Sequence, residues 1–163
     1  MKKGIAAGIL GIVSFTSGFA LGGKALVGMI NDYKERMERN LANMMLFNDW
    51  LEFLYSGGSV EQYFQDCGYK KIMVYGNGYI GKRLIQALEQ TEIDVITVMD
   101  KADFSDRNEM VIGVSEAIPS VDCIVITPVF YYDEISEMLQ KKTDIPIISM
   151  RAIINAKCRQ GEN

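Results

Sequence analysis

The chain has 163 residues, enough for one domain and an appendage, which excludes a large two-domain dehydrogenase. It contains no histidine and only three dispersed cysteines (Cys67, Cys123 and Cys158), so neither Ser-His or Cys-His catalysis, nor a zinc or other metal site, nor a disulfide framework is expected. Acidic residues outnumber basic ones by 21 to 17 without a dense basic stripe, so nucleic acid is not an expected partner.

Residues 1–30 are the expected transmembrane anchor. From Gly4 to Gly23 the chain has 20 consecutive uncharged residues, and a helix of that length spans the roughly 30 Å hydrocarbon core of a lipid bilayer. A retained single-pass anchor with the globular domain in the cytoplasm is the favoured interpretation. The alternatives are a cleavable signal peptide, with Lys2 and Lys3 as its positive end, and a helix buried in the fold.

Residues 31–68 predict an amphipathic helical stalk and a short capping helix. From Asn31 to Tyr55 apolar residues recur at helical spacing, and Trp50 and Phe53 widen the apolar side near the end. This predicts packing onto the domain or onto a second copy, since the heptad pattern is too short to establish a coiled coil. A homo-oligomer and a partner enzyme therefore both stay open as partners.

A break and a second helix start follow the stalk. Glycines at 57 and 58 interrupt the helix, and Ser59 with Gln62 three residues later predicts a capping box for a short helix over 60–67. Gly68 is placed to end that helix. The globular domain is then expected over residues 69–163.

A glycine motif follows the first strand of this domain. The apolar run from Lys71 to Tyr75 predicts a buried strand, and a helical stretch comes after the glycines. The G-x-G-x-x-G motif consists of Gly76, Asn77, Gly78, Tyr79, Ile80 and Gly81. The first glycine permits a tight turn, the second lets a pyrophosphate approach the backbone, and the third lets the helix pack closely. The context predicts phosphate or dinucleotide binding at the helix N-terminus, with a structural turn as the alternative.

A second strand is expected from Asp94 to Met99, and it leads to Asp100, 19 residues after Gly81. An acidic residue at this distance accepts hydrogen bonds from the ribose hydroxyls of a bound adenosine. Its charge also repels a 2′-phosphate, so NAD is the expected cofactor and NADP is disfavoured. The alternative to ribose binding is that Asp100 only forms the turn after the strand.

The remaining elements predict an α/β fold with a doubly wound, parallel, Rossmann-like sheet of about five strands in the order 3-2-1-4-5. The later strands are expected over 109–114, 122–127 and 145–149, with helices over 131–142 and around 152–154. Ligands of such sheets bind at the carboxyl ends of the first and fourth strands. Thr127 and Pro128 fall at that edge and are candidate ligand contacts, with loop packing as the alternative.

The segment from Gly78 to Leu84 resembles the G-[FY]-I-G-x-x-L opening of nucleotide-sugar epimerases and dehydratases in the NAD(P)-binding Rossmann superfamily. The resemblance covers residues 70 to about 150. It implies that Gly76, Gly78, Gly81 and Asp100 bind the cofactor. The Tyr-x-x-x-Lys pair of those enzymes is absent, because Ile135 and Ser136 stand four residues after Tyr131 and Tyr132.

Two classes of function follow. The first is a non-catalytic, membrane-anchored module that binds NAD or a nucleotide sugar and acts as a sensor or scaffold. The single anchor with a lone Rossmann domain resembles small proteins of bacterial surface-polysaccharide synthesis. The second is an epimerase- or dehydrogenase-like enzyme that a partner chain completes. An adaptor with a vestigial nucleotide site is a third alternative.

Overall fold

The computed structural model describes residues 2–101 and 110–156, with side chains from residue 23 onward. The chain divides into two compact units, one up to Leu41 and one from Ala42 onward. The helix α1 (Lys2–Tyr55) makes up the described part of the first unit and contributes its residues from 42 onward to the second. The second unit continues with α2 (Val60–Asp66), β1 (Lys71–Tyr75), α3 (Tyr79–Leu88), β2 (Asp94–Asp100), β3 (Val111–Gly113), β4 (Cys123–Ile126), the 3-10 turn η1 (Val129–Tyr131), α4 (Tyr132–Gln140), β5 (Ile147–Ser149) and α5 (Met150–Asn155).

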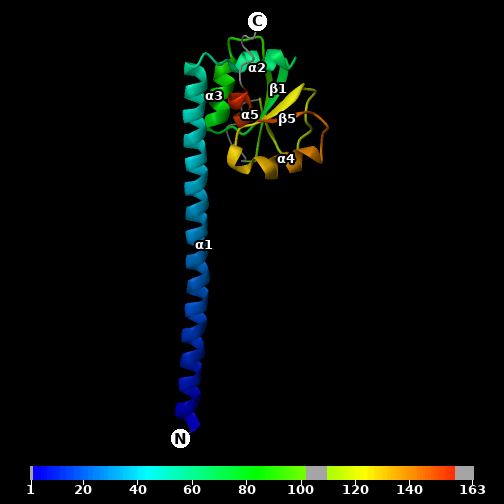
Figure 1. Cartoon of the computed structure of the whole chain (residues 1–163). Coiled ribbons are helices and arrows are strands. Elements are labelled where there is room, and N and C mark those ends of the chain that lie inside the picture. The colour runs from blue at the N-terminus through cyan, green and yellow to red at the C-terminus, as the bar shows by residue number, and fades with distance from the viewer. Residues whose placement is uncertain (1, 102–109, 157–163) are drawn as a thin grey trace. The chain divides into compact units, whose positions relative to one another are not determined.

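The second unit is built on a five-stranded parallel sheet (Figure 1). Its strand order is β3-β2-β1-β4-β5, which confirms the predicted α/β architecture. β1 lies at the centre and pairs with β2 on one side and with β4 on the other. The order reverses between β1 and β4, because β2 and β3 lie beyond one edge of β1 and β5 lies beyond β4.

Helices cover both faces of the sheet, and alternate residues of each strand face opposite ways. Ile72 and Val74 of β1 belong to a core cluster with side chains of α1, α2, α3 and α5. Met73 and Tyr75 belong to a second cluster on the other face, with Ile135 and Leu139 of α4. The central strand is therefore apolar on both faces, as the continuous apolar run from 71 to 75 predicts.

The end of α1 is part of this core. Leu46, Trp50 and Phe53 are buried together with Val60 and Phe64 of α2. The compact unit accordingly begins at Ala42, earlier than the expected boundary at residue 69. The physical reason is that one face of the sheet needs the apolar side of α1 as cover, so this part of the expected stalk is a layer of the domain.

The start of α2 matches half of the expected capping box. The Ser59 hydroxyl oxygen accepts a hydrogen bond from the Gln62 N–H at 3.2 Å, as an N-cap does. The Gln62 side chain instead donates to Asp66 at 2.8 Å, because an acceptor one helical turn ahead is within its reach. Gly68 follows the helix with a φ of +73°, the left-handed conformation that ends helices.

The other differences concern short connections and the N-terminus. Residues 114–122 between β3 and β4 form turns and irregular structure, and β3 is shorter than the strand expected over 109–114. Glu109, at the start of the expected third strand, and Cys158 lie outside the described residues. The stretch from Gly4 to Gly23 lies in α1, where side chains before residue 23 are not described. Among the described residues, no helix is both long and apolar enough to cross a bilayer.

Candidate nucleotide site at the glycine turn

The glycine motif connects β1 to α3 at the point where the strand order reverses. The turn begins after Tyr75, which pairs with Ile126 at the end of β4. The Gly76 N–H donates to the Met99 carbonyl oxygen at 2.8 Å, which ties the start of the turn to β2. The motif therefore lies at the carboxyl edge of the three central strands, where α/β sheets bind ligands.

Gly76 holds a conformation and a space that suit only glycine. Its φ is +104°, in the left-handed region that other residues rarely adopt. A Cβ at this position would come within 2.7 Å of Thr127 Oγ1 and 2.8 Å of Pro128 Cδ. Thr127 and Pro128, expected as ligand contacts, thus pack directly against the turn.

Gly81 lets α3 approach the turn. A Cβ added here would lie 1.9 Å from the Gly76 carbonyl oxygen, which no side chain tolerates. The neighbouring Ile80 is buried in the core cluster that includes α3, so it anchors the first turn of this helix. Gly76 and Gly81 therefore play the two packing roles predicted from the motif spacing.

Gly78 is different, because the space around it is open. It is the N-cap of α3 with a φ of −78° and no side-chain cap, and nothing lies within 4 Å of a Cβ built on it. The first N–H groups of a helix have no acceptor within the helix, and they carry the positive end of its dipole. At α3 these groups belong to Tyr79, Ile80 and Gly81, and the Tyr79 side chain beside them is 85% exposed. An anion can therefore approach the backbone at this point.

Asp100 lies beside the same turn. One of its carboxylate oxygens accepts a hydrogen bond from the Asn77 N–H at 2.5 Å, across 23 residues of sequence. The side chain is half-buried at the last position of β2. The structure thus brings together the glycine motif and the acidic residue, and it gives the carboxylate a role in holding the turn.

The side chain of Thr127 supports the turn. The Thr127 hydroxyl is buried and donates to the carbonyl oxygens of Tyr75 at 3.0 Å and Gly76 at 3.2 Å. Tyr75, which was not a predicted site residue, supplies one of these carbonyl groups as the last residue of β1. Burial raises the pKa of its phenol, and the negative charges of Asp100 and Glu134 raise it further, so the phenol stays protonated.

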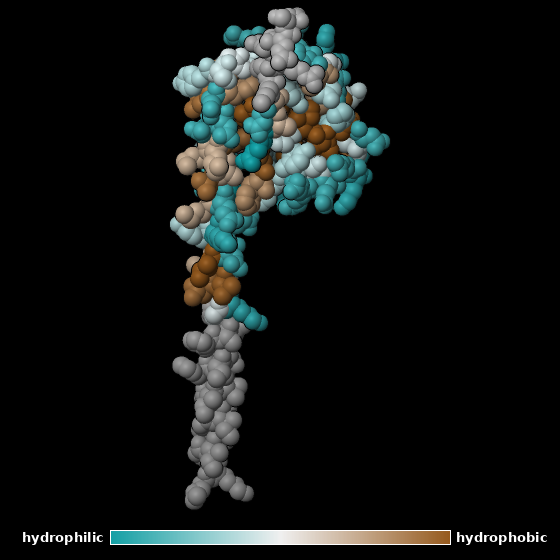
Figure 2. Space-filling view, in the orientation of Figure 1, coloured by the Kyte–Doolittle hydropathy of each residue, from teal (hydrophilic) through white to brown (hydrophobic). Residues whose placement is uncertain are grey.

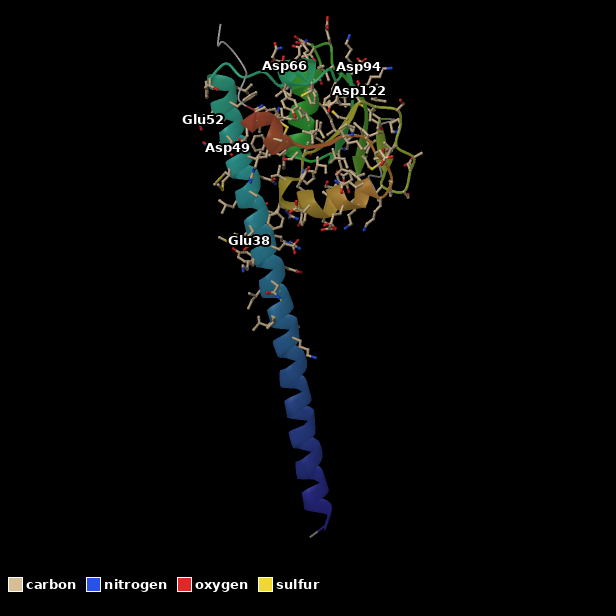
Figure 3. The ribbon with its side chains drawn as sticks, turned by 45° about the vertical axis from the view of Figure 1, so that its right-hand side comes forward. Glu38, Asp49, Glu52, Asp66, Asp94 and Asp122 are labelled. Atoms are coloured by element: carbon tan, nitrogen blue, oxygen red, sulfur yellow. The ribbon has the colours of Figure 1, made fainter. Side chains whose placement is uncertain are left out.

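A separate acidic group lies at the amino edge of the sheet. Figure 3 shows Asp66, Asp94 and Asp122 at the same end of the domain. Asp122 accepts hydrogen bonds at 2.8 Å from the N–H groups of Lys70 and Lys71, and these bonds lower the pKa of its carboxyl. This carboxylate ties β1 to the segment before β4, and it lies at the opposite end of the strands from the glycine turn.

The geometry defines what the site offers chemically. It presents backbone donors at a helix start, an exposed aromatic ring and one carboxylate, a combination suited to a phosphate attached to a sugar. Within the described part of the chain, no group of three or more acidic or thiol side chains could hold a metal ion. Comparison with family models, curated proteins and solved structures gives no match for this chain.

Proposed function

We propose that the protein is a membrane-anchored Rossmann-like module that binds NAD or a nucleotide sugar at the glycine turn, without catalysing a reaction on it. The observation that carries this proposal is the contrast among the three glycines. Gly76 and Gly81 are closed in by neighbouring atoms, whereas Gly78 faces open space at the start of α3. A turn with a purely structural role needs Gly76 and Gly81 and has no need of Gly78.

The carboxylate favours a nucleoside. Asp100 is held against the turn by the Asn77 N–H, so its charge is fixed at the end of β2, where the ribose of a bound nucleoside would lie. A carboxylate accepts several hydrogen bonds and can therefore receive ribose hydroxyls as well. The same charge disfavours the 2′-phosphate of NADP.

The absence of histidine and of the catalytic pair of the resembling enzymes favours a non-catalytic role. The sequence contains no histidine, and the Tyr-x-x-x-Lys pair of the epimerases that the glycine motif resembles is missing. The thiol of Cys123 is buried, and burial together with the Asp122 charge raises its pKa to about 12, so it does not supply a thiolate nucleophile. A sensor or scaffold fits these residues better than an enzyme that a partner completes.

The cellular setting comes from the sequence. The uncharged stretch from Gly4 to Gly23 has the length of a bilayer span, and we assign it to a single-pass anchor with the globular unit in the cytoplasm. The resemblance of this layout to small proteins of surface-polysaccharide synthesis leads us to place the protein there, beside enzymes that use nucleotide sugars.

Calorimetric titration of the full chain in detergent tests the proposal. NAD, NADH, NADP and UDP-sugars are titrated separately, and each reaction mixture is assayed for turnover. We expect one ligand class to bind without turnover. Failure of every nucleotide to bind at millimolar concentration would contradict the proposal and favour an adaptor, and turnover with a co-purified partner would favour an enzyme.

Asp100→Asn tests the nucleoside assignment in the same assay. The amide keeps an oxygen that can accept the Asn77 N–H but loses the charge. If NAD is the ligand, we expect about tenfold weaker NAD binding and a smaller preference over NADP, since a charged hydrogen bond contributes roughly 1.5–3 kcal/mol. Unchanged affinity for both would remove Asp100 from the site.

A further inference from the structure

Apolar side chains of α1 are exposed at a regular interval. In the unit that ends at Leu41, Ile30 and Met37 are 56% and 63% exposed. In the unit that begins at Ala42, Met44 and Leu51 are 64% and 53% exposed. These four residues are spaced by seven and occupy position a of a heptad. Figure 2 shows apolar residues on the described part of this helix.

The d positions complete the pattern. They are Tyr33, Phe47 and Leu54, with Asn40 as the one polar member. Tyr33 and Leu54 are exposed, and Phe47 is half-buried and stacks on Trp50 at 6.4 Å between ring centroids. The fully buried side chains that α1 gives to the core, Leu46, Trp50 and Phe53, lie at positions c and g. Of the a and d positions only Phe47 also packs against this core, and it is partly buried.

In the second unit this face of α1 borders a groove of about 340 Å³. α1 lines it with Phe47, Trp50, Leu51 and Leu54, and α3 contributes the other wall around Arg83. The indole N–H of Trp50 is buried and has no acceptor among the described residues. Because buried donors are normally satisfied, this N–H is an unsatisfied donor of a residue that lines the groove.

We propose that α1 pairs in parallel with α1 of a second copy of this chain, through the a and d positions from Ile30 to Leu54. We call these positions the seam. A strict seven-residue repeat matches the 3.5-residue period of two helices wound around each other. The apolar pattern from Ile30 to Leu54 covers more than three heptads, and the exposure of its members distinguishes it from the side of α1 that faces the core.

The area and the charges of the seam fit a second copy. With Leu41 and Tyr55 at its border, the seam exposes on the order of 800 Å² of side-chain surface per copy, similar to what each partner buries in a stable complex. In a parallel pair, g residues meet e residues of the next heptad. These pairs are Met29 with Lys34, Arg36 with Leu41, and Asn43 with Asn48, because Trp50, the next g residue, is buried in the core of its own domain. None joins like charges, and Lys34 is matched within its own helix by Glu38 at 3.7 Å.

Asn40 fixes the direction and register of the pair. In a parallel, in-register pair the two Asn40 side chains meet in the seam and hydrogen-bond to each other. In an antiparallel pair d faces a, and each Asn40 would meet an apolar side chain instead. A single polar residue of this kind specifies alignment in coiled coils at some cost in stability.

The test uses two adjacent methionines. Met44 lies at position a and Met45 at position b, and both are exposed, at 64% and 54%. The full chain in density-matched detergent is analysed by sedimentation equilibrium. We expect a dimer for wild type and for Met45→Lys, and at least tenfold weaker association for Met44→Lys. A wild-type monomer, or equal effects of the two variants, would overturn the proposal.

Cross-linking tests the direction of the pair without a charge change. Met37→Cys places a thiol at position a, whereas Glu35→Cys places one at position f on the opposite side of the helix. On oxidation we expect a disulfide-linked dimer for Met37→Cys and only the wild-type background for Glu35→Cys. Equal cross-linking of both variants would contradict the seam. So would a result in which the exposed apolar side of α1 becomes buried only when lipid vesicles are added.

Discussion

Gly81 lies in a contact that leaves no room for a side chain. A Cβ there would approach the Gly76 carbonyl oxygen to 1.9 Å, so Gly81→Ala must push α3 away from the turn. We expect a loss of about 2–3 kcal/mol in the free energy of unfolding, typical of severe overpacking. Urea unfolding followed by the fluorescence of Trp50, the one tryptophan of the chain, measures this loss.

Gly78→Ser is the matched control for that variant. The space around Gly78 is open, and serine is a favourable N-cap residue, so the free energy of unfolding should stay unchanged or rise by up to about 1 kcal/mol. Equal losses of unfolding free energy in Gly81→Ala and Gly78→Ser would contradict the conclusion that the close approach of α3 to Gly76 excludes a side chain.

How much of the site the sequence predicts depends on the distance between contacting residues. The roles of Gly76 and Gly81 follow from local spacing, because strand, turn and helix are adjacent in the chain. The Thr127 hydroxyl, by contrast, donates to carbonyl oxygens more than 50 residues away in the sequence. The sequence placed Thr127 at the carboxyl edge of the sheet but did not predict this contact. The contact of Asp100 with the Asn77 N–H likewise could not be predicted from the local sequence pattern, although the position of Asp100 at the end of the strand was predicted.

At the scale of elements, β1 was predicted with its observed bounds and β2 to within one residue. Both are apolar runs that end at a glycine or an acidic residue, and residues of these types mark strand boundaries clearly. β3 and β5 were predicted as longer strands, over 109–114 and 145–149, because no period of apolar residues can define the bounds of a strand of three residues. The packing of the end of α1 was also left open, since an apolar helix side does not identify the surface that covers it.

Within β4, the buried thiol of Cys123 predicts a pH dependence of stability. Burial raises its pKa from 9.0 to about 12 in the folded protein. The folded state therefore holds the proton more tightly, and this contribution to stability is complete below pH 9 and is lost as the pH rises towards 12. One such group costs up to about 1.4 kcal/mol per pH unit in that range.

Val125→Ala controls for the loss of packing in that experiment. Cys123 and Val125 are both fully buried in β4 and belong to the same core cluster, but only the first titrates. Urea unfolding between pH 8 and 11 should show a shallower decline for Cys123→Ala than for wild type, and the wild-type slope for Val125→Ala. The same slope in all three proteins would show that Cys123 does not titrate with a raised pKa.

At the scale of the whole molecule, the compact unit is expected to fold from Ala42 onward. Leu46, Trp50 and Phe53 are fully part of its core, so a fragment of residues 42–163 keeps the core whereas one of residues 69–163 exposes a face of the sheet. We expect cooperative thermal unfolding of the first fragment, followed by circular dichroism, and none for the second. Cooperative unfolding of the shorter fragment would contradict the assignment of α1 to the core.

The anchor is tested in cells. The protein should remain with the membrane fraction after carbonate extraction, and deletion of residues 4–23 should release it. Deletion is the appropriate change because a single substitution rarely abolishes a span of 20 uncharged residues. Release of the intact chain by carbonate, or secretion of a shortened chain, would refute a retained anchor.

The central claim is that the open glycine at the start of α3 receives the phosphates of a nucleotide. Gly78→Asp tests it most directly, because aspartate is a good N-cap that keeps α3 stable while its charge repels a phosphate. Ser59→Asp is the matched control, because it adds the same charge at the N-cap of α2, where a side chain already caps the helix. By calorimetry of the full chain, we expect Gly78→Asp to unfold as wild type does and to lose nucleotide binding, while Ser59→Asp still binds. Equal nucleotide affinity in Gly78→Asp and wild type would contradict the account.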